Sequence, residues 1–337
     1  MRLAVLGLGF MGSTHVAAMR GLPGVELAAV YSSDENKLAG DLTAVQGNLG
    51  GPGERLDFSG LRKYTEIEDV LSDSKIDGVD ICLPTYLHDT VAVEALKAGK
   101  HVLVEKPMAL DPYGADRMIN AARRYKKTLM TAQVLRFFPE YTTLRAAIGN
   151  GQLGRCRFAT FRRRCAAPAW GGWLQDAEKS GGGVFDLLIH DVDMALHLFG
   201  KPRAVCASGY CHTALGIDCL DAQLFYDDGV VEVTGGWHNA GAYPFSMEYT
   251  VTLDGGTVEY SSIGRPPALY GAKGGSQPLE MTPCDGYAAE IAYFAECCDT
   301  GKPALLCPAA ESADAVKLMR LILESRTRNG AKMICSL

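Results

Sequence analysis

The sequence predicts an α/β fold, in which a doubly wound parallel sheet is followed by an α+β domain with a large, mainly antiparallel open sheet. In the N-terminal part, short apolar strands alternate with helical stretches, the pattern of parallel βαβ units. Further on, longer strands of alternating polarity are separated by Asp/Gly turns, as in antiparallel hairpins. We place the boundary between a first domain, residues 1–132, and a second, residues 133–337.

The composition limits the classes of protein to consider. A chain of 337 residues with 47% apolar and 21% charged residues is ordinary for a globular protein of two domains. The net charge of -6 argues against a nucleic-acid or anionic-membrane partner. No apolar run is long enough to span a bilayer, and the N-terminus opens into a strand without a cleavable signal pattern. We therefore expect a cytoplasmic protein.

The cysteines do not indicate a disulfide framework. There are 11, an odd number, and none of them form a CxxC pair. We expect reduced, mostly core-type residues. Cys297 and Cys298 are adjacent on an expected helix, where their side chains diverge, so we assign them no metal or redox role.

The first strand leads into a glycine-rich turn. Arg2–Leu6 has the apolar character of a central strand buried on both faces, and GLGFMG at residues 7–12 comes next, before a helical stretch. In this context GxGxxG has a mechanical meaning: Gly7 permits the tight turn, Gly9 lets a pyrophosphate approach the backbone, and Gly12 permits close helix packing. The phosphates would lie at the helix N-terminus. The alternative is a glycine turn without a ligand.

The end of the second strand, Val25–Tyr31, bears on the type of cofactor. A site that prefers NAD carries Asp or Glu about 20 residues beyond the glycines, whereas this chain has Ser32 and Ser33 there. With two hydroxyl groups, no acid to repel a 2′-phosphate, and Lys37 one helical turn further on, the sequence slightly favours NADP over NAD. Ser33 and Asp34 can also serve simply as the N-cap of the next helix, and the two interpretations are compatible.

The rest of the first domain continues the alternation of strand and helix. We expect a loop or insertion at Gln46–Gly60, and then helices and strands at Tyr64–Ser74 (helix), Gly78–Leu83 (strand), Asp89–Ala98 (helix), Pro112–Tyr125 (helix) and Thr128–Gln133 (strand). The segment Pro84-Thr85 to His88 follows a strand end. His88 could border a nicotinamide, but a histidine at a helix N-terminus is as often structural.

Lys106 is the first catalytic candidate. The short apolar strand His101–Glu105 delivers Lys106-Pro107 at its carboxyl end, and in an open parallel sheet ligands gather at the carboxyl ends of strands. Proline removes a backbone donor and keeps Lys106 out of helical geometry, so the residue is positioned. The alternative is that Glu105 and Lys106 only solvate a strand end.

In the second domain we expect hairpin turns at Asp227–Gly229 and Asp254–Gly256. The run Arg162–Arg164 could meet a phosphate or carboxylate, although a solvated strand end explains it more simply. A packing helix at about 309–328 could close back on the first domain. The expected strands are Arg155–Arg163, Ala204–His212, Asp221–Tyr226, Val230–Trp237 and Ser246–Leu253.

A helix that begins near Asp186 has two contrasting faces. One face is apolar and would bury against the sheet, and the opposite face carries Asp186, His190, Asp193 and His197. Imidazole and carboxylate at i, i+4 spacing could bind a divalent metal. We rate acid/base chemistry higher, because a cation would compete with the lysine and the nicotinamide site.

These motifs together resemble the glucose-fructose oxidoreductase, inositol dehydrogenase and rhizopine-catabolism (Gfo/Idh/MocA) family. The resemblance covers essentially the whole chain and depends on four motifs: GxGxxG with His15, Pro84-Thr85 to His88, Glu105-Lys106-Pro107, and Gly181-Gly182-Gly183 followed by Asp186-xxx-His190-Asp191-x-Asp193. It implies an N-terminal Rossmann domain and a second domain that binds substrate and mediates oligomerisation. Homodimers or homotetramers through the second sheet are usual for the family, but the residues themselves do not fix the number.

The resemblance also implies site residues. Lys106, Asp186 and His190 match the catalytic set, Asp193 matches a substrate contact, and Trp173 matches an aromatic residue that lines the pocket. Lys106, Asp186 and His190 are also expected to contact the substrate. Together with the motif residues, the expected cofactor contacts are Gly7, Gly9, Phe10, Met11, Gly12, Ser32, Ser33, Lys37, Pro84, Thr85, His88, Glu105, Lys106 and Gln133.

The reaction that we expect is hydride transfer between the nicotinamide and a secondary alcohol of a sugar or cyclitol. His190 would be the general base, Lys106 would stabilise the alkoxide, and Asp186 would orient them. Three alternatives remain: a redox-neutral NAD-dependent glycosidase of the same superfamily, a non-enzymatic nucleotide-binding regulator, and a metal-dependent hydrolase built on the His190 stripe.

Overall fold

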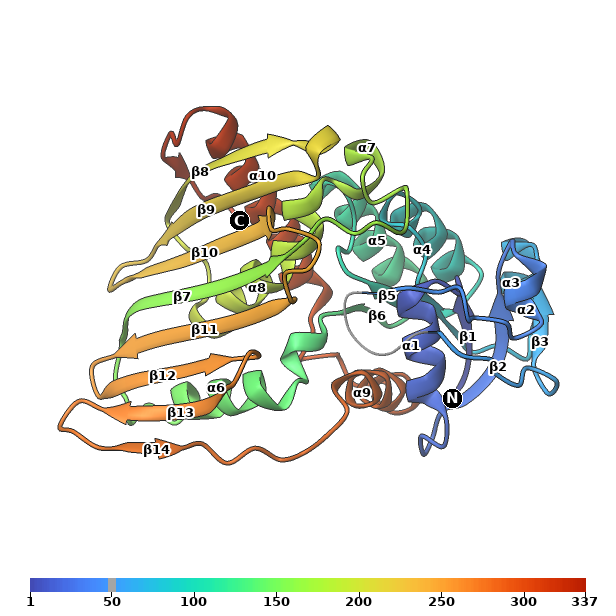
Figure 1. Ribbon diagram of the computed structural model, residues 1–337. Helices are drawn as coiled ribbons and strands as arrows, with labels where there is room; N and C mark the ends of the chain where they lie inside the picture. The colour runs from blue at the N-terminus through green and yellow to red at the C-terminus, as the bar shows by residue number, and fades with distance from the viewer. Residues whose placement is uncertain (48–52) are drawn as a thin grey trace. The chain divides into compact units, whose positions relative to one another are not determined.

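The computed structural model describes residues 1–47 and 53–337 (Figure 1). The chain divides into two compact units. Unit 1 consists of Met1–Val134 and Cys284–Ala313, and unit 2 consists of Leu135–Pro283 and Asp314–Leu337. None of the helices formed by the described residues is both long and apolar enough to cross a membrane.

Unit 1 is built on a six-stranded parallel sheet, which confirms the predicted doubly wound architecture. The strand order is β3-β2-β1-β4-β5-β6, so the direction of winding reverses between β1 and β4. At such a reversal, the loops at the carboxyl ends of the strands form a crevice for a ligand. The strands are β1 (Arg2–Leu6), β2 (Glu26–Tyr31), β3 (Arg62–Tyr64), β4 (Gly78–Ile81), β5 (His101–Glu105) and β6 (Leu129–Ala132).

Helices flank this sheet. Helix α1 contacts α9, and α4 contacts α5. The start of α5 shows how the sequence sets a helix boundary: Asp111 accepts a hydrogen bond from the Gly114 amide, and Pro112 occupies the first turn. The helices are α1 (Phe10–Met19), α2 (Glu35–Leu38), α3 (Ile67–Ser72), η1 (Thr85–Leu87), α4 (His88–Lys97), α5 (Pro112–Tyr125) and α9 (Gly286–Thr300).

Two segments of unit 1 differ from the expectations. The helix expected at Tyr64–Ser74 starts later, because residues 62–64 pair with β2 as an edge strand too short to show a period. In addition, Cys284–Ala313 clusters with unit 1, whereas the sequence placed it in the second domain. Part of the loop expected at Gln46–Gly60 lies outside the described residues.

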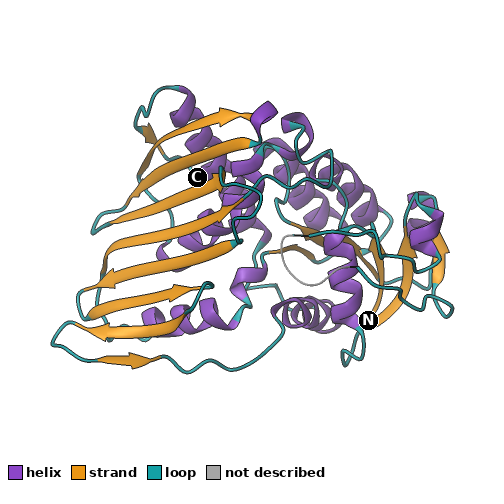
Figure 2. Ribbon diagram, viewed as in Figure 1, coloured by secondary structure: helices purple, strands orange, loops and turns teal. Residues whose placement is uncertain are grey.

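Unit 2 is built on a nine-stranded sheet (Figure 2) of order β14-β13-β12-β11-β7-β10-β9-β8-β15. Strands β10 and β7 pair in parallel and the other neighbours are antiparallel, which confirms a mainly antiparallel sheet. The strands are β7 (Cys156–Cys165), β8 (Ala204–His212), β9 (Ile217–Phe225), β10 (Val230–Trp237), β11 (Ser246–Leu253), β12 (Gly256–Ser261), β13 (Arg265–Gly271), β14 (Ser276–Pro278) and β15 (Met333–Ile334).

Helices pack against this sheet. Helix α8 contacts β7, β9 and β10, and α6 contacts β13. Large aromatic side chains, Tyr141, Phe161 and Tyr249, are fully buried here. The helices are η2 (Val134–Arg136), α6 (Pro139–Gly149), α7 (Ala177–Ser180), α8 (Gly183–Phe199), η3 (Thr213–Leu215) and α10 (Ala309–Thr327), whose first turn belongs to unit 1.

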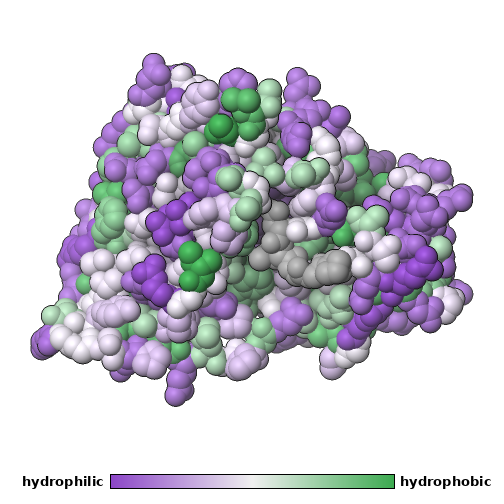
Figure 3. All heavy atoms as spheres, viewed as in Figure 1, coloured by the Kyte–Doolittle hydropathy of each residue, from purple (hydrophilic) through white to green (hydrophobic). Residues whose placement is uncertain are grey.

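The surface and the cysteines complete the description. On the face shown in Figure 3, apolar residues form separate small groups among hydrophilic ones. All 11 cysteines are free thiols, as expected, but only Cys165, Cys297 and Cys307 are buried. The expectation of mostly core-type cysteines is therefore wrong: strand residues such as Cys206 and Cys211 lie nearer the surface.

Candidate active site

The glycine-rich turn joins β1 to α1, and two of its glycines are required by packing. Gly7 has φ +100°, and a Cβ there would lie 2.7 Å from the Cys82 carbonyl oxygen. A Cβ on Gly12 would lie 1.8 Å from the Gly7 carbonyl oxygen. A Cβ on Gly9 would meet nothing within 4 Å, so space is open beside this glycine. Gly7 and Gly12 thus have the packing roles that the sequence indicates, and the open space at Gly9 is compatible with the predicted approach of a pyrophosphate.

The N-terminus of α1 fits a dinucleotide. Gly9 is its N-cap, no side chain caps the helix, and the first turn holds no acid. Its amide groups can therefore donate to an anion such as pyrophosphate. After β6, the Gln133 side chain is 2% exposed, and neither its amide nitrogen nor its amide oxygen has a hydrogen-bond partner among the described residues. A bound cofactor would supply such a partner, so these residues fit a nicotinamide dinucleotide.

At the end of β2 the structure shows the helix cap that the sequence predicts, and the cofactor contacts stay predictions. Asp34 is the N-cap of α2, and its carboxylate accepts from the amides of Asn36 and Lys37. Ser32 is 6% exposed, and its Oγ accepts from the Asp34 amide at 3.1 Å. Ser33 is exposed. Of the three predicted contacts, Ser33 and the partly exposed Lys37 are therefore more accessible than Ser32.

His88 is held by two backbone carbonyl groups, which favours the structural alternative. The side chain is 1% exposed, Nδ1 lies 2.8 Å from the Pro107 oxygen, and Nε2 lies 2.8 Å from the Leu83 oxygen. Burial lowers the pKa of this histidine. His88 therefore ties the loop after β4 to the segment that follows Lys106. Its neighbour Thr85 is also buried, at 2% exposure.

Lys106 follows β5 directly and is partly exposed. Its amide donates to Oε2 of Glu105 at 2.9 Å, and Glu105 itself is 6% exposed. The interpretation in which Glu105 solvates a strand end is therefore wrong for this residue. Its carboxylate is instead part of the interior of unit 1, beside the catalytic candidate.

Asp186 and His190 lie one turn apart on α8 in unit 2, both partly exposed. Burial and the nearby Asp186 raise the pKa of the Cys165 thiol to about 12, which places Asp186 near the end of β7. The helix is anchored by an ion pair of Arg163 and Asp191. The guanidinium Nε and Nη2 lie 2.8 and 3.1 Å from the two carboxylate oxygens. Burial alone lowers the pKa of Arg163, but Asp191 outweighs it and raises that pKa.

These contacts correct one expectation and bear on a second, which stays a prediction. The run Arg162–Arg164 in β7 is not a solvated strand end. Arg163 is 2% exposed and pairs with Asp191, and both Arg162 and Arg164 contact Glu248. Asp193, which the resemblance assigns to the substrate, is 1% exposed. Both of its oxygens accept from Arg136, at 2.7 and 2.8 Å.

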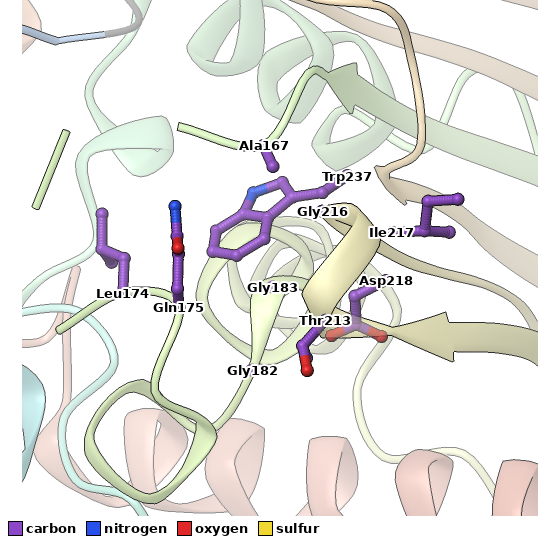
Figure 4. A pocket seen from close by; sticks show the side chains of 10 residues that line it. All are labelled: Ala167, Leu174, Gln175, Gly182, Gly183, Thr213, Gly216, Ile217, Asp218 and Trp237. Carbon is purple, nitrogen blue, oxygen red and sulfur yellow. The ribbon is translucent and has the colours of Figure 1, made fainter. Parts of the chain in front are cut away.

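A pocket in unit 2 lies beside the start of α8 (Figure 4). Trp237 lines it, whereas the predicted Trp173 packs against the neighbouring cluster of Cys165, Leu174, Leu187 and Trp237. Sequence reasoning missed Trp237, since a tryptophan that ends a strand carries no motif. The full lining is Ala167, Leu174, Gln175, Gly182, Gly183, Thr213, Gly216, Ile217, Asp218 and Trp237.

The fold and the site define a class of protein: one with an NAD-binding Rossmann sheet and a second, mainly antiparallel sheet. Residues 1–133 match the model of an oxidoreductase family with an NAD-binding Rossmann fold, and residues 141–259 match the GFO/IDH/MocA C-terminal domain. The chain therefore belongs to the Gfo/Idh/MocA oxidoreductase family.

Individual relatives agree with this assignment. The chain is 29% identical over 202 residues to a myo-inositol 2-dehydrogenase of Thermotoga maritima, a match that covers 60% of the chain and 55% of the relative. It is 25% identical over 335 residues to a Bacillus subtilis scyllo-inositol 2-dehydrogenase (NADP(+)), covering 97% of the chain and 92% of the relative. The chain spans only about half the length of several curated relatives that it matches.

A solved structure shares the fold. A levoglucosan dehydrogenase in complex with NADH superimposes with a TM-score of 0.85, at 18% identity, over 99% of this chain and 98% of that one. At this identity the similarity shows the fold alone.

Proposed function

We propose that this protein is an NAD(P)-dependent oxidoreductase that transfers hydride between a nicotinamide and a secondary alcohol or ketone of a sugar or cyclitol. The observation that carries the proposal is the carboxyl edge of the unit 1 sheet. There the uncapped start of α1 and the unpartnered amide of Gln133 fit a dinucleotide, and Lys106 follows β5 at the same edge. The names of the relatives, inositol dehydrogenases among them, support the substrate class.

Three side chains of this protein would take part in catalysis beside the cofactor. The bound nicotinamide would accept or deliver the hydride. His190 would take the proton of the substrate hydroxyl as general base, because the ordinary pKa of histidine lies close to neutral pH. Lys106 would stabilise the negative charge that develops on the oxygen. Asp186, one turn before His190 on α8, would orient the histidine.

We further propose a slight preference for NADP. Ser33 and Lys37 at the end of β2 can donate to a 2′-phosphate, and the Ser32 position holds no acid that would repel one. The Bacillus subtilis relative carries NADP(+) in its name, whereas the levoglucosan dehydrogenase was solved with NADH. We also propose that the protein forms a homodimer or homotetramer through the unit 2 sheet, where Phe158, Tyr210 and Tyr270 are exposed.

The experiment is a nicotinamide absorbance assay with NAD and NADP against aldoses, cyclitols and glycosides. Lys106→Ala and His190→Ala should each lower turnover at least about a hundredfold, the scale for removing an acid/base or oxyanion group. Binding of NADH or NADPH, followed by fluorescence, should persist. Lys97→Ala and His212→Ala are matched controls at exposed positions and should behave as wild type.

Two results would contradict the proposal. Near-normal turnover of either site variant would remove that residue from the catalytic set. Glycoside cleavage with flat absorbance would instead identify the redox-neutral glycosidase.

A further inference from the structure

A buried cluster of one imidazole and three carboxyl groups lies inside unit 1. His15 comes from α1, Asp80 from β4, Glu105 from the end of β5 and Glu290 from α9. Glu105 is 6% exposed and the other three are 0% exposed. Nδ1 of His15 lies 2.8 Å from Asp80 Oδ2, while Nε2 lies 3.2 Å from Glu105 Oε1 and 3.7 Å from Glu290 Oε1.

The charges of this cluster determine which groups hold protons. Burying uncompensated charges is very costly, so three carboxylates around one imidazole must take up protons. Burial by itself lowers the pKa of His15, but Asp80 outweighs it, and the pKa is raised well above its ordinary value. Burial also raises the pKa of Glu290 well above its ordinary value. Both shifts favour the protonated forms of His15 and Glu290.

The His15 ring faces Asp80 and Glu105 from opposite ring nitrogens. Toward Asp80 it makes a hydrogen bond. Nε2 makes no hydrogen bond of good geometry, so its attraction to Glu105 is mainly the attraction of opposite charges at 3.2 Å. Among the described residues, both oxygens of Glu290 also lack hydrogen-bond partners.

Glu105 connects this cluster to the catalytic candidate. One oxygen of its planar carboxylate faces His15 and the other accepts from the Lys106 amide at 2.9 Å. On the far side of Lys106, His88 holds the Pro107 carbonyl at 2.8 Å. The buried side chains of Glu105 and His88 therefore fix the backbone on either side of the Lys106 side chain. In the proposed function, the ammonium group of Lys106 must reach the substrate.

We propose that His15 is a positioning residue for Lys106, which it holds in place through the Glu105 carboxylate, with Glu290 as the third acid of the cluster. This inference rests on the proposed function for the catalytic importance of Lys106. The link from His15 to the Lys106 backbone can be measured without any substrate.

The test uses two substitutions that each keep one side of the ring. In His15→Asn the amide group can replace Nδ1 toward Asp80 but cannot reach Glu105, and in His15→Gln the amide can replace Nε2 toward Glu105. We expect His15→Asn to speed hydrogen exchange of the Lys106 amide at least about tenfold and to lower kcat about ten- to a hundredfold. KM and the dissociation constant for NADH or NADPH should stay within about threefold of wild type. His15→Gln should retain most of both properties, and Glu105→Gln should resemble His15→Asn.

His101→Asn is the matched control. It makes the same chemical change at the opposite end of β5, where His101 Nδ1 accepts from the Thr128 amide, and should leave Lys106 exchange and kcat unchanged.

Several outcomes would overturn the inference. One is a folded His15→Asn variant in which the Lys106 amide exchanges at the wild-type rate. Another is an equal loss of amide protection and kcat in His15→Asn and His15→Gln, which would indicate a structural role alone. If His15→Asn does not fold, Glu105→Gln decides, and wild-type exchange in that variant is contrary to the inference. Normal turnover of Lys106→Ala would overturn the proposed function, while the exchange result would still show whether His15 holds this strand end.

Discussion

Substitution of the Arg136–Asp193 pair can test whether Asp193 is a structural or a substrate-binding residue. Both side chains are almost fully buried in unit 2, and the guanidinium donates to both carboxylate oxygens, at 2.7 and 2.8 Å. Removing one partner of such a pair leaves a buried charge uncompensated, which typically costs about 3–5 kcal/mol. Replacing both partners with apolar residues of similar volume is often nearly neutral, because no charge is then left buried.

The experiment is a double-mutant cycle of Arg136→Met, Asp193→Leu and the double variant, each unfolded in urea. All three tryptophans, Trp170, Trp173 and Trp237, lie in unit 2, so their fluorescence reports the unfolding of this unit. Each single variant should lose about 3–5 kcal/mol of unfolding free energy, and the double variant should lose less than the sum of the two. The exposed pair Arg155–Asp228 has similar hydrogen-bond lengths and is the matched control, with a much smaller expected loss.

One result would refute this reasoning. If Asp193→Asn kept its unfolding free energy within about 1 kcal/mol of wild type while KM for the sugar rose, the carboxylate would be a substrate ligand. The role implied by the family resemblance would then be right, and the pairing with Arg136 secondary.

Two further predictions concern unit 1. Ser32→Asp should lower the ratio of NADPH to NADH affinity at least about tenfold, because a carboxylate at the end of β2 repels a 2′-phosphate and accepts from ribose hydroxyls. An unchanged ratio of the two dissociation constants would contradict our interpretation of this strand end. The hydrogen bond from Arg2 holds the pKa of Asp77 at about 2, below its unfolded value. Since a lowered carboxyl pKa stabilises the fold only above the unfolded value, this contribution should disappear as the pH falls from about 4 to about 2. The melting temperature of Asp77→Asn should therefore approach that of the wild type as the pH falls over that range. A difference in melting temperature that stayed constant with pH would refute this prediction.

Much of the fold could be predicted because local patterns determine it. The strands Ala204–His212, Val230–Trp237 and Ser246–Leu253 have the predicted bounds, since each is a run of β-favouring residues between turn residues. The edge strand β3, with three residues, is too short to show a period, and α9 was not delimited as an element. The clustering of Cys284–Ala313 with unit 1 also depends on long-range contacts, such as α9 with α1, to which no local pattern points.

The site residues also differ in whether a local pattern or a long-range contact determines their role. Gly7 and Gly12 were predictable because part of their requirement is local: Gly7 has φ +100° in the turn itself, and the oxygen that excludes a Cβ on Gly12 belongs to Gly7 in the same turn. The partner of Asp193 is 57 positions away and that of Asp191 is 28 positions away, so the sequence shows only an acidic helix face. That face was interpreted as acid/base chemistry, but Asp193 on it and Asp191 beside it are buried counterions of arginines.

This distinction bears on how the helix that carries His190 can work. General acid/base chemistry requires a proton acceptor held within a few tenths of an ångström, and a single amphipathic helix can slide along its apolar contacts. Bidentate pairs with guanidinium groups have fixed directions, so Arg163 on β7 and Arg136 at the end of η2 lock α8 at Asp191 and Asp193, directly after His190. In unit 1, Glu105 lies 3.2 Å from His15 Nε2 and accepts a hydrogen bond from the Lys106 amide. In both units, buried charges that do not touch the reacting atoms would set the positions of the residues that do.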